Sequence, residues 1–172
     1  MELYDVLKVR YSCRKYKPEP VSKELILKVM DVARKAPSGM NLQPWKFIAV
    51  TDAESREKLC EAYDREWFAA APVIIAACSL TGVGYKRKYD GQDFTWVDVA
   101  IAFDHLTLAA TNEGLGTCWI GAFREDVAKK ALGVPDDVRV MAMTPLGYPD
   151  GEPAPRKPRK EMNEVLAWEK WE

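Results

Sequence analysis

Apolar and polar positions predict helices and strands that alternate along the chain. Helical spacing of apolar residues covers residues 2–9, 22–35, 52–63, 93–113 and 125–132, with a final short helix or arm over 162–171. Short apolar runs predict buried strands over residues 45–50, 72–78, 117–120 and 138–146. Helices dominate, so we expect an α+β or mixed α/β domain with a small sheet and long helices.

Residues with capping preferences mark several helix ends. Ser22 suits the N-cap of the second helix, and Thr51 or Asp52 suits the N-cap of the third. Gly114 ends the long helix, and Gly133 ends the helix that follows it. These signals support the boundaries drawn from the apolar pattern.

Length and composition limit the class of protein. The 172 residues suffice for one domain with a substantial core, so residues 1–172 are treated as a single domain. A formal net charge of −1 gives no basic excess for binding nucleic acid. No apolar run reaches the length of a membrane span, and the acidic N-terminus lacks the apolar region of a signal peptide. We therefore expect a cytoplasmic protein that does not bind membranes.

The four cysteines and the single histidine do not form a metal-binding pattern. Cys13, Cys60, Cys78 and Cys118 are widely spaced, without a Cys-x-x-Cys pair. Zinc and iron–sulfur sites are therefore disfavoured, and reduced, mostly buried thiols are expected. His105 lies in an apolar helix, where we interpret it as a core histidine rather than a catalytic base.

Residues 36–45, Ala-Pro-Ser-Gly-Met-Asn-Leu-Gln-Pro-Trp, form the most informative loop. It joins an amphipathic helix to an apolar strand, and two prolines and a glycine set its backbone. Ser38, Asn41 and Gln43 supply neutral hydrogen-bonding groups but no good nucleophile, base or metal ligand. The loop suits a flat ligand with polar edges better than it suits acid–base chemistry.

Basic residues alternate in two segments near the ends of the chain. Arg10, Ser12 and Arg14 alternate in the first turn, and Lys157 and Arg159 alternate in the tail. Alternate side chains of an extended segment point the same way. If the two segments meet, their cations and a hydroxyl group converge and favour a dianion such as a phosphate ester. Taken separately, each segment is explained about equally well by a phosphate site and by a basic surface exposed to solvent.

Glycine-rich nucleotide-binding motifs are absent from the sequence. There is no Gly-x-Gly-x-x-Gly and no Gly-x-x-x-x-Gly-Lys-Ser/Thr, so a Rossmann or P-loop site is disfavoured and side chains would hold any phosphate.

Residues 114–123, Gly-Leu-Gly-Thr-Cys-Trp-Ile-Gly-Ala-Phe, combine a helix C-cap with a buried strand. Gly121 and Ala122 are small enough for a ligand to approach the backbone closely.

The tail carries more aromatic surface than a solvated segment usually does. Tyr148, Trp168 and Trp171 lie in it, and exposed apolar groups of this kind mark interaction surfaces. We expect the arm over residues 150–172 to pack on a second subunit. The alternative is that it packs back on its own domain.

Four segments, in this order, resemble the small FMN-dependent nitroreductases over nearly the whole chain. They are Arg-Tyr-Ser-Cys-Arg at 10–14, the loop at 36–45, Gly-Leu-Gly-Thr-Cys-Trp-Ile-Gly at 114–121, and Leu-Gly-Tyr-Pro at 146–149 followed by Pro155, Lys157 and Arg159. The resemblance implies an α+β nitroreductase-like fold with a small central mixed or antiparallel sheet. It also implies an intertwined homodimer with two FMN sites at its interface and NAD(P)H as co-substrate.

The same resemblance implies which residues hold the FMN phosphate. Arg10 and Ser12 match phosphate-binding positions, as do Lys157 and Arg159, and Tyr11 belongs to the same cofactor-binding turn. This assignment agrees with the charge pattern of the two segments.

Other residues match positions around the flavin ring. Arg14 matches a cation at the N1/O2 edge, and Gly121 matches the residue whose backbone N–H faces N5, with Ile120 and Ala122 beside it. One loop is implied to pack against the isoalloxazine bound mainly by the other subunit. Its residues with this role are Pro37, Ser38 and Gly39. Asn41 is also assigned to the cofactor-binding set, and Asn41 and Gln43 are given mainly loop-shaping roles.

Flavin chemistry would account for the lack of an acid–base constellation. As the resemblance implies, flavin N5 accepts hydride from a nicotinamide and passes electrons to a nitroaromatic, quinone or flavin acceptor by a ping-pong mechanism. Reduction places negative charge near N1/O2, where Arg14 would stabilise it. No side-chain acid or base is expected to be catalytic.

Two segments depart from larger members of the family. Residues 63–68 stand where those members carry an additional polar and basic cluster, so no cofactor role is assigned there. The segment 82–96 is short, and its aromatic residues are equally good candidates for the substrate pocket and for the dimer interface. These residues are Tyr85, Tyr89, Phe94 and Trp96.

Other functions stay open at this point. A same-fold enzyme with another reaction is one alternative: iodotyrosine dehalogenation, azoline oxidation or flavin fragmentation. The sequence lacks an obvious long lid insertion, which weakens the dehalogenase. A non-catalytic FMN-binding or redox-buffering protein is the second alternative. NADH, NADPH and a low-potential protein donor are all compatible with the sequence.

Overall fold

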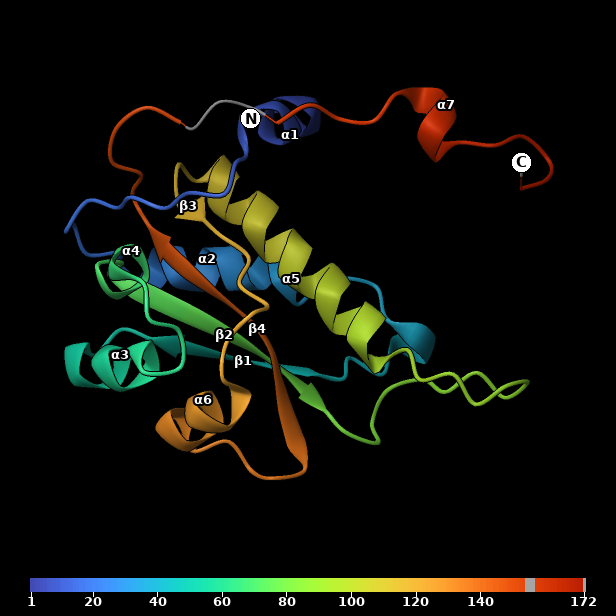
Figure 1. The fold of residues 1–172 in the computed structure, drawn as a ribbon, viewed down its shortest axis with the longest axis horizontal. Helices are drawn as coiled ribbons and strands as arrows, with labels where there is room; N and C mark the ends of the chain where they lie inside the picture. The colour runs from blue at the N-terminus through green and yellow to red at the C-terminus, as the bar shows by residue number, and fades with distance from the viewer. Residues whose placement is uncertain (154–156, 172) are drawn as a thin grey trace.

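A four-stranded antiparallel sheet lies at the centre of the computed structural model, which describes residues 1–153 and 157–171 (Figure 1). The strand order is β1-β2-β4-β3. The strands are β1 (Trp45–Val50), β2 (Val73–Leu80), β4 (Val138–Gly147) and β3 (Gly116–Thr117), and every neighbouring pair is antiparallel. The predicted α+β class with a small antiparallel sheet is confirmed.

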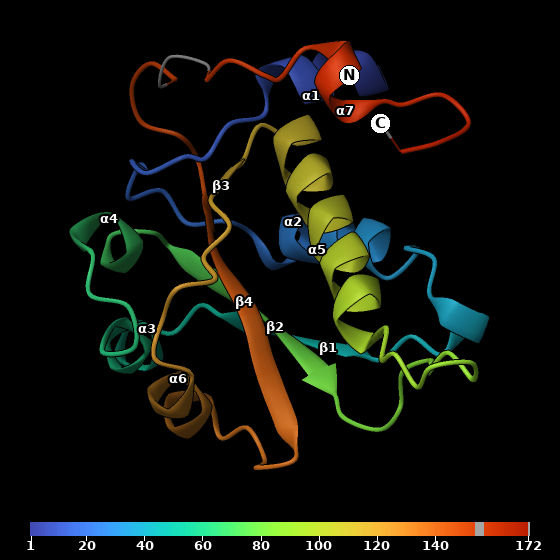
Figure 2. The same cartoon turned by 45° about the vertical axis from the view of Figure 1, so that its right-hand side comes forward.

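Helices cover both faces of this sheet and create two cores. Alternate residues of the buried strand β2 point to opposite faces. Val73 and Ile75 pack with α2 (Lys23–Ala33) and α5 (Thr95–Asn112). Ile74 and Ala76 pack on the other face with α3 (Ala53–Cys60), α4 (Glu66–Ala69) and α6 (Glu125–Leu132). Figure 2 shows the sheet separating these two groups of helices.

The predicted helix caps are present. The Ser22 hydroxyl accepts a hydrogen bond from the Leu25 amide at 3.2 Å, and the Asp52 carboxylate accepts one from the Ser55 amide at 2.9 Å. Gly114 follows α5 with a φ of +76°, a left-handed conformation that favours glycine. Helix α1 (Leu3–Val9) also lies where the apolar pattern predicts it.

The helix predicted over residues 52–63 is present but ends three residues early. Helix α3 ends at Cys60, and the short helix α4 follows it. Phe68 is fully buried on α4, and its ring meets the Tyr63 ring edge-on at a centroid distance of 5.4 Å. Tertiary packing of aromatic rings, which helical periodicity does not encode, therefore sets the path of this segment.

The strand predicted over residues 117–120 is regular only at Gly116–Thr117. The next residue, Cys118, would pair with Pro145, which has no N–H group to donate. The Cys118 amide donates instead to the Thr144 hydroxyl at 3.0 Å. Ile120 then pairs with Met143 through backbone hydrogen bonds of 2.8 and 3.0 Å. Residues 118–121 therefore follow the sheet without being a full member of it.

The described part of the tail lies on the surface. Helix α7 (Met162–Val165) is shorter than the predicted helix or arm over 162–171. Residues 157–171 are all exposed, and Trp171 is 97% exposed. Packing back on its own domain is therefore not observed for residues 157–171, whereas Tyr148, at the start of the tail, does pack against the protein's own core. Among the described residues, no helix combines the length and apolar character needed to cross a membrane.

Candidate functional site

The basic turn at residues 10–14 is attached to β3. Ser12 forms a parallel bridge with Thr117, and the Cys13 amide donates to the Thr117 carbonyl at 2.8 Å. Gly116 makes this approach possible, because a Cβ there would lie 2.8 Å from both Cβ and Sγ of Cys13. The turn and the segment leading to Gly121 therefore form one continuous surface.

The first turn also meets the start of the tail. Tyr16 forms a bridge with Pro149, and the Lys17 amide donates to the Tyr148 carbonyl at 2.9 Å. An ion pair of 2.7 Å joins Lys15 to Asp150. The residues that follow the basic turn therefore meet the residues that begin the tail, and this contact does not include Lys157 or Arg159.

The second pair of predicted phosphate-binding cations lies further along the tail. Pro155 is outside the described residues, and Lys157 and Arg159 are exposed. Figures 1 and 2 both show the segment that contains them running alongside α1, the helix that ends just before Arg10. No hydrogen bond or ion pair within residues 1–153 and 157–171 joins them to the turn, so their convergence with Arg10 stays a prediction.

Within the described part of the chain, no carboxylate pairs with the cations of the turn. None of the ion pairs found within the described residues includes Arg10 or Arg14. The Arg14 guanidinium lies over the Trp67 ring, 5.7 Å from its centroid. Burial raises the pKa of the Cys118 thiol, and the positive charges of Arg14 and Arg10 oppose that rise. Both cations therefore act on the strand segment beside the turn.

Two hydroxyl groups near the turn bear on what it can bind. The Thr117 hydroxyl is buried and has no hydrogen-bond partner in the described part of the chain. Burial raises the pKa of Tyr11 to about 12, with a further contribution from its contact with Cys13, so its phenol stays neutral at physiological pH. Unpaired guanidinium groups beside neutral hydroxyl groups are a suitable set of donors for a phosphate ester.

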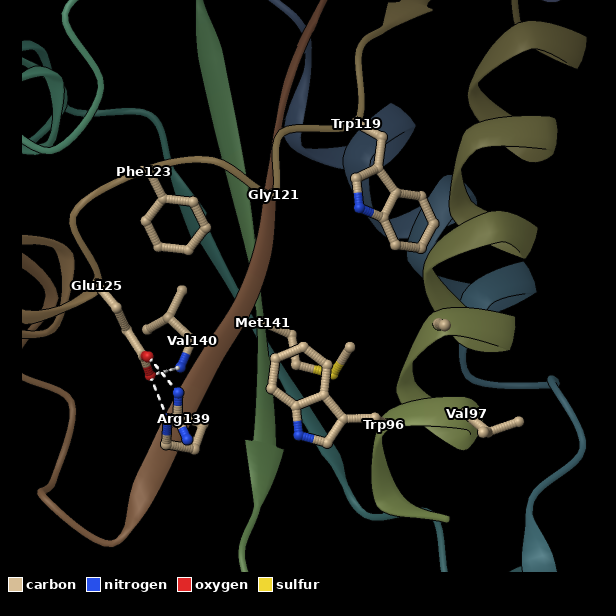
Figure 3. Close-up of a pocket in the computed structure, with 10 residues that line it drawn as sticks. Trp96, Val97, Trp119, Gly121, Phe123, Glu125, Arg139, Val140 and Met141 are labelled. Atoms are coloured by element: carbon tan, nitrogen blue, oxygen red, sulfur yellow. Dashed lines mark hydrogen bonds and ion pairs between the residues drawn. The ribbon is translucent and has the colours of Figure 1, made fainter. Parts of the chain in front are cut away.

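A cavity of about 540 Å³ opens beside the end of the same segment (Figure 3). Trp96, Trp119 and Phe123 supply aromatic walls, and Gly121 and Met141 complete the side nearest the sheet. The Trp119 ring is held edge-on against Phe103 at a centroid distance of 4.5 Å. The cavity is therefore suited to a flat, largely apolar ligand.

A β-bulge helps to form this cavity. The β2–β4 register pairs Ala77 with Ala142 but Cys78 with Val140, so Met141 is an additional residue in β4. Bulges commonly redirect a side chain near a functional site. Met141 is mostly buried and belongs to the core, and it also lines the cavity.

The charged groups at the cavity are paired with each other. The Arg139 guanidinium contacts both carboxylate oxygens of Glu125, at 2.7 and 2.6 Å, and it lies 6.0 Å from the centroid of Trp96. Glu125 also accepts a hydrogen bond from the Val140 amide at 3.0 Å. Arg139, with the Val140 amide, lowers the pKa of this carboxyl below its ordinary value. The cavity therefore offers no unpaired charge to a ligand.

Gly121 and Ile120 have different surroundings. Gly121 is exposed at the cavity, and a Cβ added to it would meet no atom within 4 Å. Ile120 is buried in the core between the sheet, α3 and α6. Gly121 is thus open to a ligand, whereas the Ile120 side chain anchors the segment and does not line the cavity.

The loop at residues 36–45 is held by its own polar groups. Met40, Asn41 and Gln43 have φ values of 51°, 57° and 50°, which are uncommon for residues other than glycine. The Gln43 amide donates to the Ser38 hydroxyl at 3.0 Å, and the Gln43 side chain donates to the Asn41 carbonyl at 3.3 Å. These bonds agree with the loop-shaping role predicted for Asn41 and Gln43, and Ser38 shares that role.

This loop and the basic turn lie at opposite ends of α5. Gly39 contacts Tyr85 and Asp98, at the N-terminal end of the helix. The amino group of Met1 donates to Asn112 at 2.7 Å, which places α1 and the turn after it at the C-terminal end. The 18 residues of α5 span about 27 Å at 1.5 Å per residue. One protomer therefore does not bring the two predicted halves of the flavin site together.

The four aromatic candidates of segment 82–96 separate into different environments. Trp96 lines the cavity. Tyr85 and Phe94 pack against each other at a centroid distance of 6.1 Å, with Tyr85 beneath Gly39. Tyr89 is exposed and lies near Lys88. Only Trp96 is thus placed to contact a ligand in the cavity.

Other expectations about single residues are modified by the structure. His105 is only partly buried, and its Nδ1 lies 3.0 Å from the Ile101 carbonyl, so its hydrogen bond is satisfied but it is not a core residue. Trp119, Phe123 and Met141 were not singled out from the sequence. The segment that contains Trp119 was singled out from the sequence for its small residues, whereas no local sequence pattern predicts the bulge at Met141.

Comparison with known proteins gives the family. The nitroreductase family model matches residues 7–66 and 60–148, which together are well over half of the chain. The chain belongs to the nitroreductase family. It is therefore an oxidoreductase by family, as the four segments predicted.

Individual relatives of this nitroreductase family protein agree. A protein of Methanothermobacter thermautotrophicus, provisionally named NADH dehydrogenase/NAD(P)H nitroreductase, is 34% identical over 162 residues, covering 91% of this chain and 82% of the relative. An iodotyrosine deiodinase of Thermotoga neapolitana is 30% identical and covers 93% of this chain and 95% of the relative. A Bacillus subtilis protein named FMN reductase (NAD(P)H) is 31% identical and covers 88% of this chain and 68% of the relative.

A solved structure shows the same fold. The crystal structure of a nitroreductase family protein from Clostridium difficile 630 is 32% identical and has a TM-score of 0.91, covering 99% of this chain and 100% of that chain. The similarity extends over the sheet and both helical layers.

Proposed function

We propose that this protein is an FMN-dependent oxidoreductase that transfers electrons from NAD(P)H to a small aromatic acceptor. One observation carries the proposal: a turn with two arginines that form no ion pair within residues 1–153 and 157–171 is continuous with a strand segment that ends in an open glycine at an aromatic cavity. This surface offers charge for a phosphate at one end and apolar walls for a ring at the other. The names of two relatives, an NAD(P)H nitroreductase and an FMN reductase, support the same cofactor and donor.

The residues fit FMN and divide its binding between them. Arg10, Ser12 and Tyr11 would hold the phosphate, with Lys157 and Arg159 supplied by the tail. Gly121 would let the ring approach its backbone N–H, because nothing occupies the space beside its Cα. The buried Thr117 hydroxyl, which has no hydrogen-bond partner in the described part of the chain, would be an additional polar group between these two ends.

The chain's own residues would influence the reaction by charge and shape. When bound, FMN supplies hydride acceptance and electron transfer. Arg14 would stabilise the negative charge that reduction places at the N1/O2 edge of the ring. The aromatic walls formed by Trp96 and Trp119 would exclude water and orient a planar acceptor. No side-chain acid or base is required of the protein.

A homodimer would complete the site. The loop at 36–45 and the turn at 10–14 belong to opposite ends of α5, so only a second subunit can supply the loop to the flavin held by the turn. Exposed apolar side chains support such an interface, since monomers rarely expose extended apolar surface. They include Leu3, Tyr4 and Leu7 on α1 and Trp168 and Trp171 on the arm.

Dehalogenation is the second candidate reaction, because an iodotyrosine deiodinase matches over nearly its whole length. The cavity favours a neutral acceptor over an amino acid, since the Arg139–Glu125 pair leaves no charge for a carboxylate or an ammonium group. Nitroaromatics, quinones and flavins therefore remain the preferred acceptors, and iodotyrosine belongs in the panel used to test them.

The decisive measurement is stopped-flow reduction of the bound flavin by NADH and by NADPH, followed by an acceptor panel. We expect yellow protein that releases FMN on denaturation, rapid bleaching by at least one nicotinamide, and reoxidation by quinones or nitroaromatics. Protein that cannot be reconstituted with FMN would refute the proposal. Bound FMN that neither nicotinamide reduces rapidly would favour an FMN carrier or a protein electron donor instead.

A further inference from the structure

Asp98 is a buried carboxylate to which the proposed function assigns no role. It is only 4% exposed, on the first turn of α5. No ion pair in the described part of the chain includes it. A buried charge is costly unless hydrogen bonds or dipoles compensate it, so its retention at this position calls for a physical reason.

Its hydrogen-bond partner lies in the loop at 36–45. Both carboxylate oxygens of Asp98 accept from the Gly39 amide, each at 3.2 Å. The helix N-terminus adds a favourable dipole for a negative side chain on the first turn. The carboxylate is therefore stabilised by the loop and by the helix dipole, and within residues 1–153 and 157–171 its hydrogen bonds go to the loop alone.

Gly39 also lies against a second side chain, that of Tyr85. A Cβ on Gly39 would lie 2.5 Å from Cβ of Tyr85, so this backbone lies against the Tyr85 side chain. The Tyr85 carbonyl accepts from the Phe94 amide at 2.9 Å, immediately before α5. The Gly39 peptide thus contacts both Asp98, on the first turn of that helix, and Tyr85, which is hydrogen-bonded to the residue just before the helix.

The loop needs such an attachment because its backbone is strained. Three of the four residues from Met40 to Gln43 have positive φ values, and conformations of this kind persist only where the surroundings determine them. The internal bonds of Ser38 and Gln43 fix the second half of the loop. The Asp98–Gly39 contact is the bond that fixes its first half.

We propose that Asp98 is a positioning residue of the flavin site. By orienting the Gly39 peptide, its carboxylate sets the surface that residues 37–41 present to the FMN bound mainly by the other subunit. This inference rests on the proposed function for its second half, the effect on FMN. Its first half, the ordering of the loop, concerns the protein alone.

The first experiment measures amide hydrogen exchange at residues 37–42 in the FMN-free protein. Asp98→Ala removes the acceptor, and we expect the Gly39 amide to exchange about tenfold faster or more, the range for losing a charge-assisted hydrogen bond. Asp98→Asn keeps an acceptor oxygen but removes the charge, and we expect a smaller increase. Asp104→Asn is the matched control, because Asp104 is an exposed aspartate on the same helix.

The second experiment measures FMN dissociation and the visible circular dichroism of the bound flavin. We expect faster FMN release and an altered flavin signal in the order Asp98→Ala, Asp98→Asn, wild type, with Asp104→Asn equal to wild type. The dichroism reports the surroundings of the ring, which a general loss of stability would not change in the protein that remains folded. If Asp98→Ala does not fold, Asp98→Asn carries both comparisons.

The outcomes separate the two halves of the inference. Unchanged exchange at Gly39 in a folded Asp98 variant would overturn the role in ordering the loop, whether or not FMN binds. Faster exchange with unchanged FMN release and dichroism would overturn the role at the flavin. A wild-type protein that binds no FMN would refute the proposed function, while the exchange measurement would still decide the first half.

Discussion

At the scale of single residues, Gly116 and Gly121 lie in the same segment but tolerate a methyl group very differently. A Cβ on Gly116 would meet Cys13 at 2.8 Å, whereas a Cβ on Gly121 would meet nothing within 4 Å. Neither glycine has a positive φ, so space alone distinguishes them. The fold therefore requires a glycine at position 116, whereas only a bound ligand would require one at position 121.

We predict that Gly121→Ala keeps the unfolding midpoint of the FMN-free protein but weakens FMN binding about tenfold, since the methyl group would occupy the ligand's space. Gly116→Ala should instead lower the free energy of unfolding by about 1–3 kcal/mol through overpacking. Thermal unfolding and FMN titration of both variants measure the contrast. Unchanged FMN affinity in Gly121→Ala would show that the ring does not approach this glycine.

Arg14 carries the second prediction at this scale. Arg14→Ala removes a cation with no carboxylate partner, and we expect the midpoint potential of bound FMN to fall by tens of millivolts, where about 30 mV corresponds to ~1.4 kcal/mol for a two-electron couple. Arg14→Lys, which keeps the charge, should restore most of the potential. A redox titration measures both, and an equal potential in wild type and Arg14→Ala would reject the assigned role.

At the scale of elements, the Glu125–Arg139 pair joins α6 to β4 beside the cavity. The folded protein lowers the pKa of Glu125 below its ordinary 4.5, chiefly through Arg139. Ionised Glu125 therefore stabilises the folded state above pH 4.5, and this contribution is lost as the pH falls through the lowered pKa. The Arg139 side chain is 51% exposed, so solvent screening keeps the contribution small.

We predict that Glu125→Gln lowers the free energy of unfolding by about 1 kcal/mol or less at pH 7. The difference from wild type should shrink as the pH falls from 4.5 through the lowered pKa of Glu125, because the wild-type carboxyl then becomes protonated in the folded state too. Urea unfolding at a series of pH values measures this trend. Glu57→Gln, an exposed change on α3 outside any ion pair in the described residues, is the control. A gap that does not narrow as the pH falls below 4.5 would contradict the account.

Much at this scale was predictable from the sequence, for a physical reason. Ser22 and Asp52 act on amides three residues away, and the apolar spacing of α2, α5 and β2 reflects burial along each element. The shortening of β3 depends on Pro145, which lies opposite in space but 27 positions after Cys118 in sequence. The bulge at Met141 depends on the β2–β4 register. Pairings of this kind are not encoded locally.

The candidate site was likewise predictable in part. The turn at 10–14 and Gly121 were recognised from the residues themselves, and the structure brings both to one surface. Of the aromatic walls, Trp96 was a candidate, whereas Trp119 and Phe123 were missed because they gain their role only through the path of residues 118–121. Asp98 was missed because its use depends on a contact across 59 positions of sequence.

At the scale of the whole molecule, a site built from two subunits makes a prediction that a site within one chain does not. Arg10→Glu should disable the phosphate turn, and Gly39→Val should displace the loop because Tyr85 leaves no space for a side chain. Homodimers of either variant should retain little FMN. A mixed dimer should recover about half of the wild-type FMN content, since one of its two sites combines an intact turn with an intact loop.

Differentially tagged chains, purified as the mixed dimer, allow this measurement by flavin absorbance after denaturation. Mixed dimers of two Arg10→Glu chains with different tags are the control for the purification. A mixed dimer of the two variants that binds no more FMN than the homodimers would place turn and loop in the same chain. Sedimentation of the wild-type protein as a monomer would contradict the shared site directly.

The interrupted pairing of β3 also affects how the protein resists aggregation. An exposed sheet edge invites a foreign strand, and short, broken or charged edges prevent this. One edge of this sheet is the two-residue strand β3, beside which Ser12 already occupies a bridge. The other edge, β1, carries the exposed Lys46. The irregular path that opens Gly121 to a ligand thus also removes a template on which misfolded chains could assemble.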